Sequence, residues 1–216
     1  RVLLPEYVTA ELSWEQLLKI KEDSLSKLNI TMKSGVSIDT VNTKENIIID
    51  SQGKSHHFDS LILATGSRPF VPENAQLHLP GRFTIRKKDD ADRLKKYLDN
   101  TNLTPEEQHV VIVGGGLLGL ELAAALKHKK VKITIIQRAS RLMERQLDRI
   151  SSKLLAEEVQ LRDIQIYFDN EVSTVFETEN PNEIEIALKS GRIITANAIV
   201  YTIGTIPNIE IAKESG

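Results

Sequence analysis

Residues 109 to 138 constrain the fold of this chain more than any other stretch, because they follow the order strand, glycine turn, helix and strand. The four segments are HVVIV (109–113), GGG (114–116), LLGLELAAALKH (117–128) and VKITIIQ (131–137). Two apolar strands about twenty residues apart and joined by a helix are typical of a βαβ unit with parallel strands. The stretch therefore predicts an α/β fold built around a parallel sheet.

Gly114, Gly116 and Gly119 have the spacing GxGxxG at the turn between the first strand and the helix. In a dinucleotide-binding turn the first glycine permits the sharp bend, the second lets a pyrophosphate approach the backbone, and the third lets helix and strand pack closely. The N–H groups at the helix N-terminus then hold the pyrophosphate. We predict such a site here and include Leu117 and Leu118, which begin the helix, among its cofactor-binding residues. The alternative is a glycine-rich turn that binds nothing.

The second strand ends on Gln137 and Arg138, where a dinucleotide-binding fold usually has Asp or Glu. An acid at this position accepts hydrogen bonds from the ribose 2′-hydroxyl and repels a 2′-phosphate. Gln137 can bond a hydroxyl without repelling phosphate, and Arg138 or Arg141 could pair with a 2′-phosphate. Arginine at a strand end is also common as a solvated surface residue. The sequence therefore leaves NADH and NADPH both open.

The N-terminal part of the chain predicts a helix followed by short antiparallel strands. Ser13 and Gln16 form a capping-box pattern at the start of a helix predicted over 13–28. Three further runs resemble strands, at 29–34, 36–42 and 46–51. The apolar run LILA (61–64) predicts a buried strand.

Prolines between residues 68 and 84 indicate a domain boundary. Beyond it the sequence predicts a charged helix at 87–100, the βαβ unit, a helix near 146–160, a strand at 164–168, a second antiparallel meander and a buried strand at 198–204. Both halves share α/β elements, a meander and a final apolar strand that ends in glycine, which is a weak internal repeat. We predict two related Rossmann-like nucleotide-binding domains with antiparallel meanders, the first of them truncated.

The composition excludes several kinds of site and partner. The 216 residues contain no cysteine, which excludes a disulfide, a thiolate metal site and a cysteine nucleophile within this chain. A net charge of −2 gives no electrostatic reason to expect nucleic acid or an anionic membrane as partner. The apolar run 110–120 is interrupted by Glu121 too early for a membrane span. The N-terminus has no signal-peptide pattern, so a cytoplasmic protein is expected. His56 and His57 are interpreted as surface residues, and no metal site is predicted.

Four motifs together resemble the pyridine nucleotide-disulfide oxidoreductase superfamily of FAD-dependent, NAD(P)H-oxidising flavoproteins. They are FDSLILATGSRP (58–69), RKKDDADRL (86–94), VVIVGGGLLGLELAAAL (110–126) and AIVYTIGTIPN (198–208). Within the superfamily, RVLLPEY (1–7), RLMERQLD (141–148) and PNIEIAKESG (207–216) resemble the reductase region of NAD(P)H-dependent nitrite reductases. Rubredoxin and ferredoxin reductases and NADH oxidases are similar as well. The lack of cysteine argues against the disulfide-reductase branches.

The resemblance implies roles for individual residues. The NAD(P)H pyrophosphate would lie on the glycine turn, with Glu121 and Gly204 near the nicotinamide. The residues expected to contact FAD are Arg1 beside the flavin ring, Val36 at the adenine, and Ala64, Thr65 and Gly66. For Glu121 a plain surface role is equally consistent, because an acid is favourable near the positive end of a helix dipole.

Several features depart from the family's pattern. Gln137 and Asn197 replace acids, Lys130 and Asp163 replace glycines, and Ile206 replaces an arginine. The N-terminal FAD motif GxGxxG and a later Gly-Asp motif are not found in the sequence, and iron–sulfur or sirohaem domains would need cysteines that it lacks. We therefore expect part of a longer protein, with a partial FAD-binding domain at 1–83, an NAD(P)H-binding domain at 84–205 and a return segment toward the FAD domain at 206–216.

The function implied by the resemblance is that of a flavoprotein oxidoreductase. It would pass hydride from NADH or NADPH to FAD and electrons onward to a downstream acceptor domain or protein, as the reductase part of a nitrite reductase. The alternatives are a rubredoxin or ferredoxin reductase, an NADH oxidase-like flavoprotein, or a nucleotide-binding fragment without activity. A homodimer is left open.

Overall fold

The computed structural model describes residues 3–18 and 27–216. They form two compact units, which are considered separately. Unit 1 combines residues 3–17 with residues 69–204, and unit 2 combines the described residues between 18 and 68 with residues 205–216. Residues 3–17 and 69–83, expected in the partial FAD domain, thus belong to the same unit as the βαβ segment.

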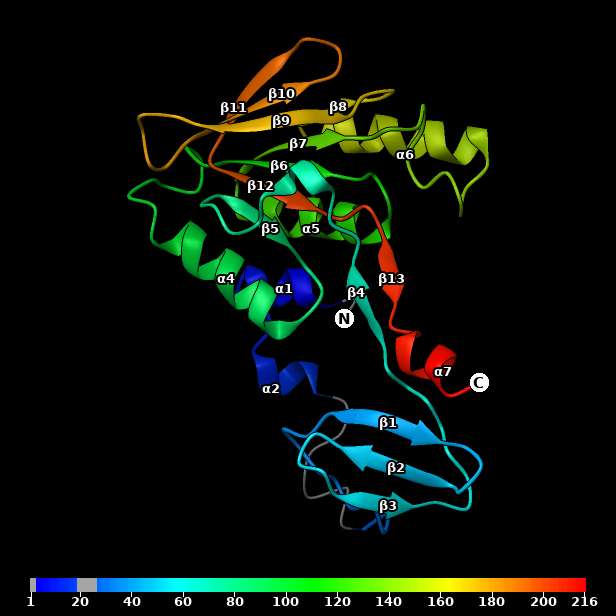
Figure 1. The fold of residues 1–216 in the computed structure, drawn as a ribbon. Helices are drawn as coiled ribbons and strands as arrows, with labels where there is room; N and C mark the ends of the chain where they lie inside the picture. The colour runs from blue at the N-terminus through cyan, green and yellow to red at the C-terminus, as the bar shows by residue number, and fades with distance from the viewer. Residues whose placement is uncertain (1–2, 19–26) are drawn as a thin grey trace. The chain divides into compact units, whose positions relative to one another are not determined.

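Unit 1 is built around a five-stranded parallel sheet (Figure 1). The strand order is β5 (Arg82–Thr84), β12 (Ala198–Tyr201), β6 (His109–Val113), β7 (Lys132–Ile136) and β8 (Ile164–Tyr167). Each neighbouring pair is parallel. The apolar run 198–201 is buried at all four positions, as expected for a strand covered on both faces. The predicted βαβ unit is confirmed, with α5 (Leu117–His128) as its crossover helix.

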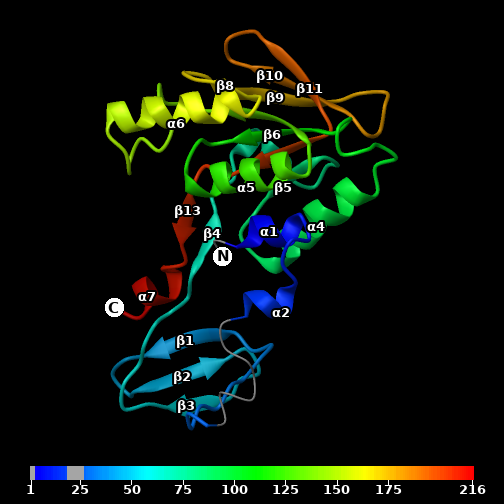
Figure 2. The ribbon, with the colours of Figure 1, turned by 180° about the vertical axis from the view of Figure 1, so that it is seen from behind.

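Helices cover one face of this sheet, and Figure 2 shows α5 and α6 in front of it. The helices of unit 1 are α1 (Leu4–Val8), α2 (Trp14–Leu17), α4 (Lys88–Asp99), α5 and α6 (Arg149–Leu161). Ile112 and Ile133 of the sheet share a buried core with Leu122 and Leu126 of α5. Burial of such side chains stabilises the layer by about 1.5–3 kcal/mol each.

The other face of the sheet is covered by the second meander. It consists of β9 (Val172–Glu177), β10 (Ile184–Leu188) and β11 (Ile193–Ala196), in the order β11-β10-β9. Both pairings are antiparallel, as predicted. Ile184 and Ile186 of β10 pack on Val111 and Tyr201 of the parallel sheet. The short 3-10 helix η1 (Glu73–Ala75) contributes Ala75 to the same core.

Unit 2 contains the first meander, with β1 (Ile38–Asn42), β2 (Ile47–Asp50) and β3 (Ser55–His57) in sequential antiparallel order. The last residues add α7 (Glu210–Glu214), which contacts β1. A two-stranded sheet pairs β13 (Thr205–Pro207) with β4 (Ser67–Pro69). These short elements were not predicted from the sequence.

Two predicted strands are wrong. Residues 29–34 form no strand, and residues 61–64 have neither strand structure nor burial. Ile62 is 88% exposed and Leu63 is 44% exposed. A buried parallel strand requires hydrogen-bonding neighbours on both sides, and the described part of unit 2 has only the antiparallel meander and the β4-β13 pair. An apolar run alone does not supply those neighbours.

The capping box predicted at the first helix is present. The backbone N–H of Ser13 donates to Gln16 Oε1 at 2.8 Å, and the Gln16 N–H donates to Ser13 Oγ at 3.4 Å. The helix α2 is described only from Trp14 to Leu17. The rest of the predicted helix falls partly on residues 19–26, which lie outside the described residues.

Lys130 and Asp163, at two positions where the resemblance predicts glycine, both have left-handed backbone conformations. Their φ values are 68° and 55°. Lys130 follows α5, and Asp163 follows α6 directly before β8. Each residue therefore adopts the backbone geometry that favours glycine at a helix end. Within the described residues no helix is long and apolar enough to cross a membrane.

Candidate functional site

A cleft of about 560 Å³ lies entirely within unit 1, at the carboxyl ends of β6, β7 and β12. Its lining comes from the glycine turn, the ends of these strands, the loop before α6, the meander and the segment before η1. Six predicted cofactor residues line it: Gly114, Gly116, Leu117, Gln137, Arg138 and Gly204. Ligands of open α/β sheets bind at this edge of the sheet, so tertiary structure and motif indicate the same site.

The three glycines of the motif have different surroundings. A Cβ added to Gly119 would lie 2.1 Å from the carbonyl oxygen of Gly114, so only glycine allows this close packing. Gly114 has a φ of 113°, which an L side chain rarely adopts. A Cβ on Gly116 would meet nothing within 4 Å. The space beside Gly116 therefore fits a pyrophosphate that approaches the backbone.

Gln137 is buried beneath the glycine turn and hydrogen-bonded at both ends of its carboxamide. Its Oε1 accepts the Gly115 backbone N–H at 2.8 Å, and its Nε2 donates to the Arg141 carbonyl at 3.1 Å. The side chain thus joins the turn to the loop after β7. An uncharged residue stands where an acid was expected, and its exposed fraction is only 8%.

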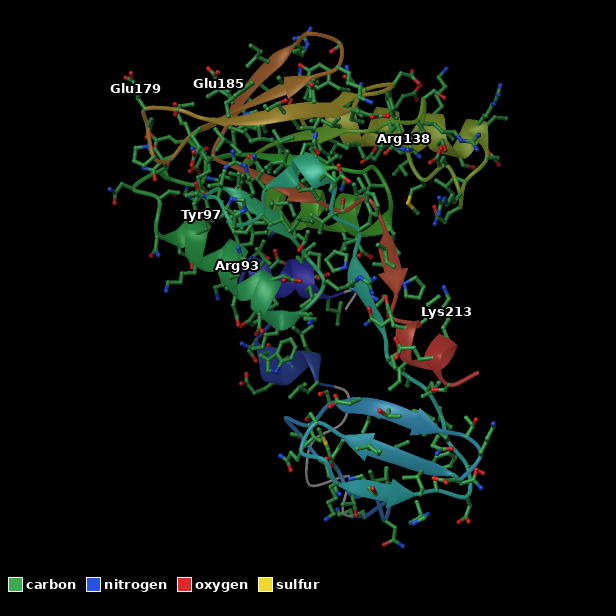
Figure 3. All side chains as sticks on the ribbon, viewed as in Figure 1. Arg93, Tyr97, Arg138, Glu179, Glu185 and Lys213 are labelled. Carbon is green, nitrogen blue, oxygen red and sulfur yellow. The ribbon has the colours of Figure 1, made fainter. Side chains whose placement is uncertain are left out.

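The cationic side chains near the end of β7 differ in position. Arg138 lines the cleft and is exposed; Figure 3 labels it. Arg141 is not part of the lining, and its Nη2 donates to the Glu144 carbonyl at 2.9 Å. Arg145 and Lys189 line the cleft and were missed in the sequence. Lys189 lies more than fifty residues along the chain from the motif, at a meander turn, so no local pattern could identify it.

The opposite end of the cleft is formed by Phe70, Leu117 and residues 202–204. The Thr202 hydroxyl lies 3.0 Å from the Val113 carbonyl oxygen and 3.1 Å from that of Gly114. It therefore fixes the end of β12 to the glycine turn. Gly204 accepts the Phe70 N–H at 3.0 Å, which holds the segment before η1 at the rim of the cleft.

Glu121 does not line the cleft, although it follows the glycine motif. It is partly buried on α5. Burial is the main cause that raises the pKa of its carboxyl group, and the negative charge of the nearby Glu6 raises it further. Glu6 belongs to α1, and its buried Oε2 has no hydrogen-bond partner among the described residues. Leu118 and Gly119 are also absent from the lining. Leu118 packs on the helical core, and Gly119 lies against the Gly114 carbonyl.

Three of the expected FAD contacts lie in an exposed turn of unit 2. Ala64, Thr65 and Gly66 are exposed, and the side chain of Asn208 donates to the Thr65 carbonyl at 2.9 Å. Gly66 has a φ of 71° and accepts the Asn208 N–H at 3.0 Å. The turn is therefore exposed and held by hydrogen bonds to Asn208. Arg1 lies outside the described residues.

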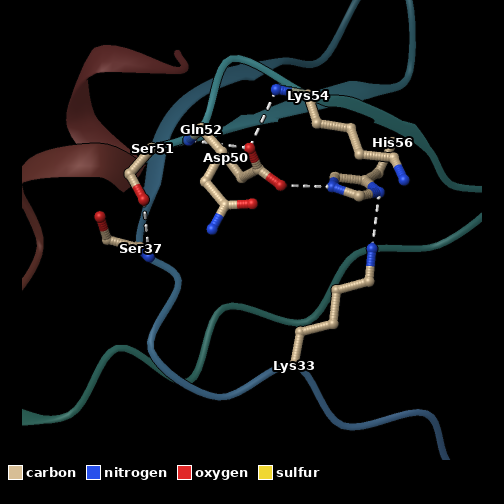
Figure 4. A network of polar contacts seen from close by, with 7 residues as sticks. All are labelled: Lys33, Ser37, Asp50, Ser51, Gln52, Lys54 and His56. Atoms are coloured by element: carbon tan, nitrogen blue, oxygen red, sulfur yellow. Dashed lines mark hydrogen bonds and ion pairs between the residues drawn. The ribbon is translucent and has the colours of Figure 1, made fainter.

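Val36, the expected adenine contact, directly precedes Ser37, which belongs to the polar network that Figure 4 shows. The neighbouring Ser37 donates its N–H to Ser51 Oγ at 3.3 Å and accepts the Ser51 N–H at 2.9 Å. Ser51 follows Asp50, a buried carboxylate bonded by His56 Nε2 at 2.7 Å. The hydrogen bond from His56 is the largest of the effects that lower the pKa of the Asp50 carboxyl group.

His56 therefore supports the hairpin. Its Nδ1 lies 3.3 Å from Lys33 Nζ, which can only donate. The ring thus links two segments, and both of its nitrogens already have partners. Throughout the part of the chain that the structure describes, no group of three His, Cys, Asp or Glu side chains could hold a metal ion.

The chain matches the family model described as pyridine nucleotide-disulphide oxidoreductase over residues 4–216. It is 26% identical over its whole length to the assimilatory nitrate reductase electron transfer subunit of Bacillus subtilis (strain 168), of which it covers 27%. It is 28% identical over its whole length to the nitrite reductase [NAD(P)H] large subunit of Klebsiella oxytoca, of which it covers 22%. The chain thus spans about a quarter of the length of these relatives.

Solved structures share the fold. This chain is similar to a chain in the structure of the covalent putidaredoxin reductase–putidaredoxin complex. The TM-score is 0.89 and the sequence identity 24%, over 99% of this chain and 51% of the other. The ferredoxin reductase for the CYP199A2 system of Rhodopseudomonas palustris matches with a TM-score of 0.87 and 21% identity, over 100% of this chain and 52% of the other. The predicted α/β fold with Rossmann-like domains is confirmed.

Proposed function

Because the chain belongs to the pyridine nucleotide-disulphide oxidoreductase family, we propose that its cleft binds NADH or NADPH for a flavoprotein that passes electrons onward. The observation that carries this proposal is the open space beside Gly116 at the mouth of the cleft. The pyrophosphate would lie there, against the N-terminus of α5. Adenosine would extend toward Arg138 and the nicotinamide toward Gly204.

The side chains of unit 1 bind and orient the dinucleotide. The carboxamide of Gln137 fixes the glycine turn, so the Gly116 backbone is already in place before binding. Thr202 ties β12 to the same turn. Leu117 and Phe70 give the nicotinamide end an apolar lining, which reduces access of water to a bound ring.

FAD, the second expected cofactor, would contact Ala64, Thr65, Gly66 and Val36 of unit 2. When bound, it supplies the group that accepts hydride from the reduced nicotinamide. The exposure of the 64–66 turn supports a role in contacting a ligand or further protein. Sirohaem and iron–sulfur groups, if the whole protein uses them, would belong to segments other than this cysteine-free chain.

For the electron acceptor, the proposal is a nitrite reductase-type protein. The two curated relatives named above support it, and the chain would then be the reductase part. A ferredoxin or rubredoxin reductase, or an NADH oxidase-like flavoprotein, is the second candidate, and a ferredoxin reductase and a putidaredoxin reductase share the fold of this chain. Steady-state reduction of nitrite, ferredoxin or oxygen by the whole protein with NAD(P)H separates them.

Calorimetric titration of this chain with NADH and with NADPH tests the binding proposal. Wild-type protein is expected to bind at least one of them, and Gly116→Ala to weaken binding at least about tenfold with an unchanged melting temperature. Glu179→Ala, in an exposed turn outside the cleft, is the control. Absence of binding to wild-type protein, or undiminished binding to Gly116→Ala, would contradict the proposal.

A further inference from the structure

A methionine in the loop between β7 and α6 lies directly beside the glycine turn. Met143 lines the cleft and is partly buried. Its backbone N–H donates to the Gly115 carbonyl at 2.9 Å, so this residue is joined to the turn itself. A dinucleotide that approaches the turn would therefore pass close to Met143.

The backbone holds Met143 in place. Its φ of 50° lies in the left-handed region, which costs an L residue energy. The Met143 carbonyl accepts the N–H groups of Gln146 and Leu147, each at 2.9 Å. These bonds and the bond to Gly115 hold a conformation that is otherwise unfavourable. The fold of unit 1 thus fixes the position of residue 143 at the cleft.

Sulfur is scarce in this chain. The 216 residues contain two methionines and no cysteine. The second methionine, Met32, belongs to unit 2 and is 62% exposed. Met143 and Met32 are therefore the two side chains that an oxidant can convert to a sulfoxide. Of the two, Met143 lines the cleft and Met32 does not.

Met143 is not packed into a core. Among the described residues it belongs neither to the two buried apolar clusters of unit 1 nor to the side chains that pack against them. Oxidation of a methionine within a core disrupts the packing, because a flexible apolar side chain becomes polar. At position 143 the sulfur can gain an oxygen while both clusters stay intact. The cleft of about 560 Å³ admits an oxidant as small as hydrogen peroxide.

We propose that Met143 is an oxidation site through which hydrogen peroxide regulates dinucleotide binding. The inference rests on the proposed binding function and adds its regulation. The lone pair of the Met143 sulfur attacks one peroxide oxygen, so that an S–O bond forms and the O–O bond breaks. The proton of the attacked oxygen passes to the leaving hydroxide, which becomes water. The sulfur loses an electron pair and the peroxide gains it.

The sulfoxide oxygen brings partial negative charge into a site for an anionic ligand. The N–H groups at the glycine turn and the N-terminus of α5 favour a pyrophosphate, and the dipole of the sulfoxide opposes it. The apolar thioether is lost at the same time. Oxidised Met143 should therefore weaken dinucleotide binding. Methionine sulfoxide reductases restore the thioether, so the change is reversible.

Calorimetry on the whole chain tests the proposal with NADH and NADPH, before and after treatment with hydrogen peroxide and its removal. Peptide mass spectrometry reports the oxidation of Met143 and of Met32. Complete oxidation of Met143 should weaken binding at least about fivefold. The melting temperature should change by less than about 2 °C, because neither core is touched. Methionine sulfoxide reductases for both epimers should restore the affinity, and their thiol reductant meets no cysteine in this chain.

Two variants assign the effect, each compared with its own untreated sample. Met32→Leu should lose affinity on peroxide treatment as the wild type does. Met143→Leu should lose less than about 1.5-fold, because leucine has no sulfur to oxidise. A protection experiment uses NAD⁺ and NADP⁺ at saturating concentration. Since oxidation follows exposure, the bound dinucleotide should slow oxidation of Met143 at least about threefold and leave the rate at Met32 unchanged.

Several outcomes would overturn the regulation and leave the proposed binding function intact. They are equal affinities before and after complete oxidation of Met143, a Met143 that stays reduced while Met32 is oxidised, and a loss of affinity in peroxide-treated Met143→Leu. A fall in melting temperature that accompanies the loss in the wild type would also overturn it, since the effect would then be general unfolding. If the untreated protein binds neither dinucleotide, the proposed function fails as well, so the two failures are distinguishable.

Discussion

The carboxamide oxygen of Gln137 accepts the backbone N–H of Gly115 at 2.8 Å, across 22 residues of sequence. The same carboxamide donates to the Arg141 carbonyl at 3.1 Å. The residue that replaces the expected acid therefore has a structural role in addition to any contact with a ribose. It holds the glycine turn and the loop after β7 together.

Gln137→Glu should lower the ratio of NADPH to NADH affinity at least about tenfold. The carboxylate can still accept the Gly115 N–H, but it cannot donate to Arg141 and it repels a 2′-phosphate. Fluorescence or calorimetric titration with both dinucleotides measures the ratio. Gln165→Glu, exposed on β8, is the control. An unchanged ratio would refute the influence of position 137 on cofactor choice.

Gly119→Ala should destabilise unit 1, lowering the melting temperature by at least about 5 °C. The new methyl group would lie 2.1 Å from the Gly114 carbonyl oxygen and 2.7 Å from Thr202 Oγ1. Gly116→Ala is the matched control, since its methyl group meets nothing within 4 Å. Circular dichroism or calorimetry on both variants decides the matter, and equal melting temperatures would show that the helix can move away.

His109 should make the protein less stable as the pH falls from about 6.5 toward 4. Burial lowers the pKa of His109 to about 4 from its ordinary 6.5. The unfolded chain thus binds more protons in this range, so stability is present above pH 6.5 and is lost as the pH falls, by at most about 3 kcal/mol.

Urea unfolding at pH 7, 6 and 5 measures this effect. The ring of His109 bridges the Thr195 carbonyl at 2.8 Å and the Thr134 hydroxyl at 2.9 Å, so His109→Gln is the closest replacement that does not titrate. The variant should lose less stability between pH 7 and 5 than the wild type. Parallel losses would assign the acid sensitivity to carboxylates instead.

Asp163→Gly should raise the stability by about 0.5–1 kcal/mol. Asp163 has a φ of 55°, a conformation that costs an L residue energy and glycine little. Asp163→Ala is the paired control and should lower the stability, because alanine lacks the short polar side chain that tolerates this conformation. Denaturant midpoints of the three proteins give the order, and a Gly variant below the wild type would contradict it.

The sequence predicted the parallel βαβ unit, the second meander, two strands of the first meander and the place of the glycine turn, because each depends on local patterns. Apolar periodicity and glycine spacing extend over only a few residues, so they can be recognised in the sequence alone. The capping box at Ser13 and Gln16 was predictable for the same reason. The apolar run 61–64 was misread, because burial of a strand depends on neighbouring strands that a local pattern does not reveal.

What the sequence determined by itself was the nucleotide-binding architecture, since the chemistry of the glycine turn is local. Tertiary structure alone decided which charges meet at the cleft. Arg145, from the loop before α6, and Lys189, from a meander turn, both line the cleft. Arg141 is closer to β7 in sequence, but it lies outside the lining and donates to the Glu144 carbonyl. Long-range packing determines which of these side chains reach the cleft. Residues that are far apart in the chain share no local sequence pattern from which their proximity could be predicted.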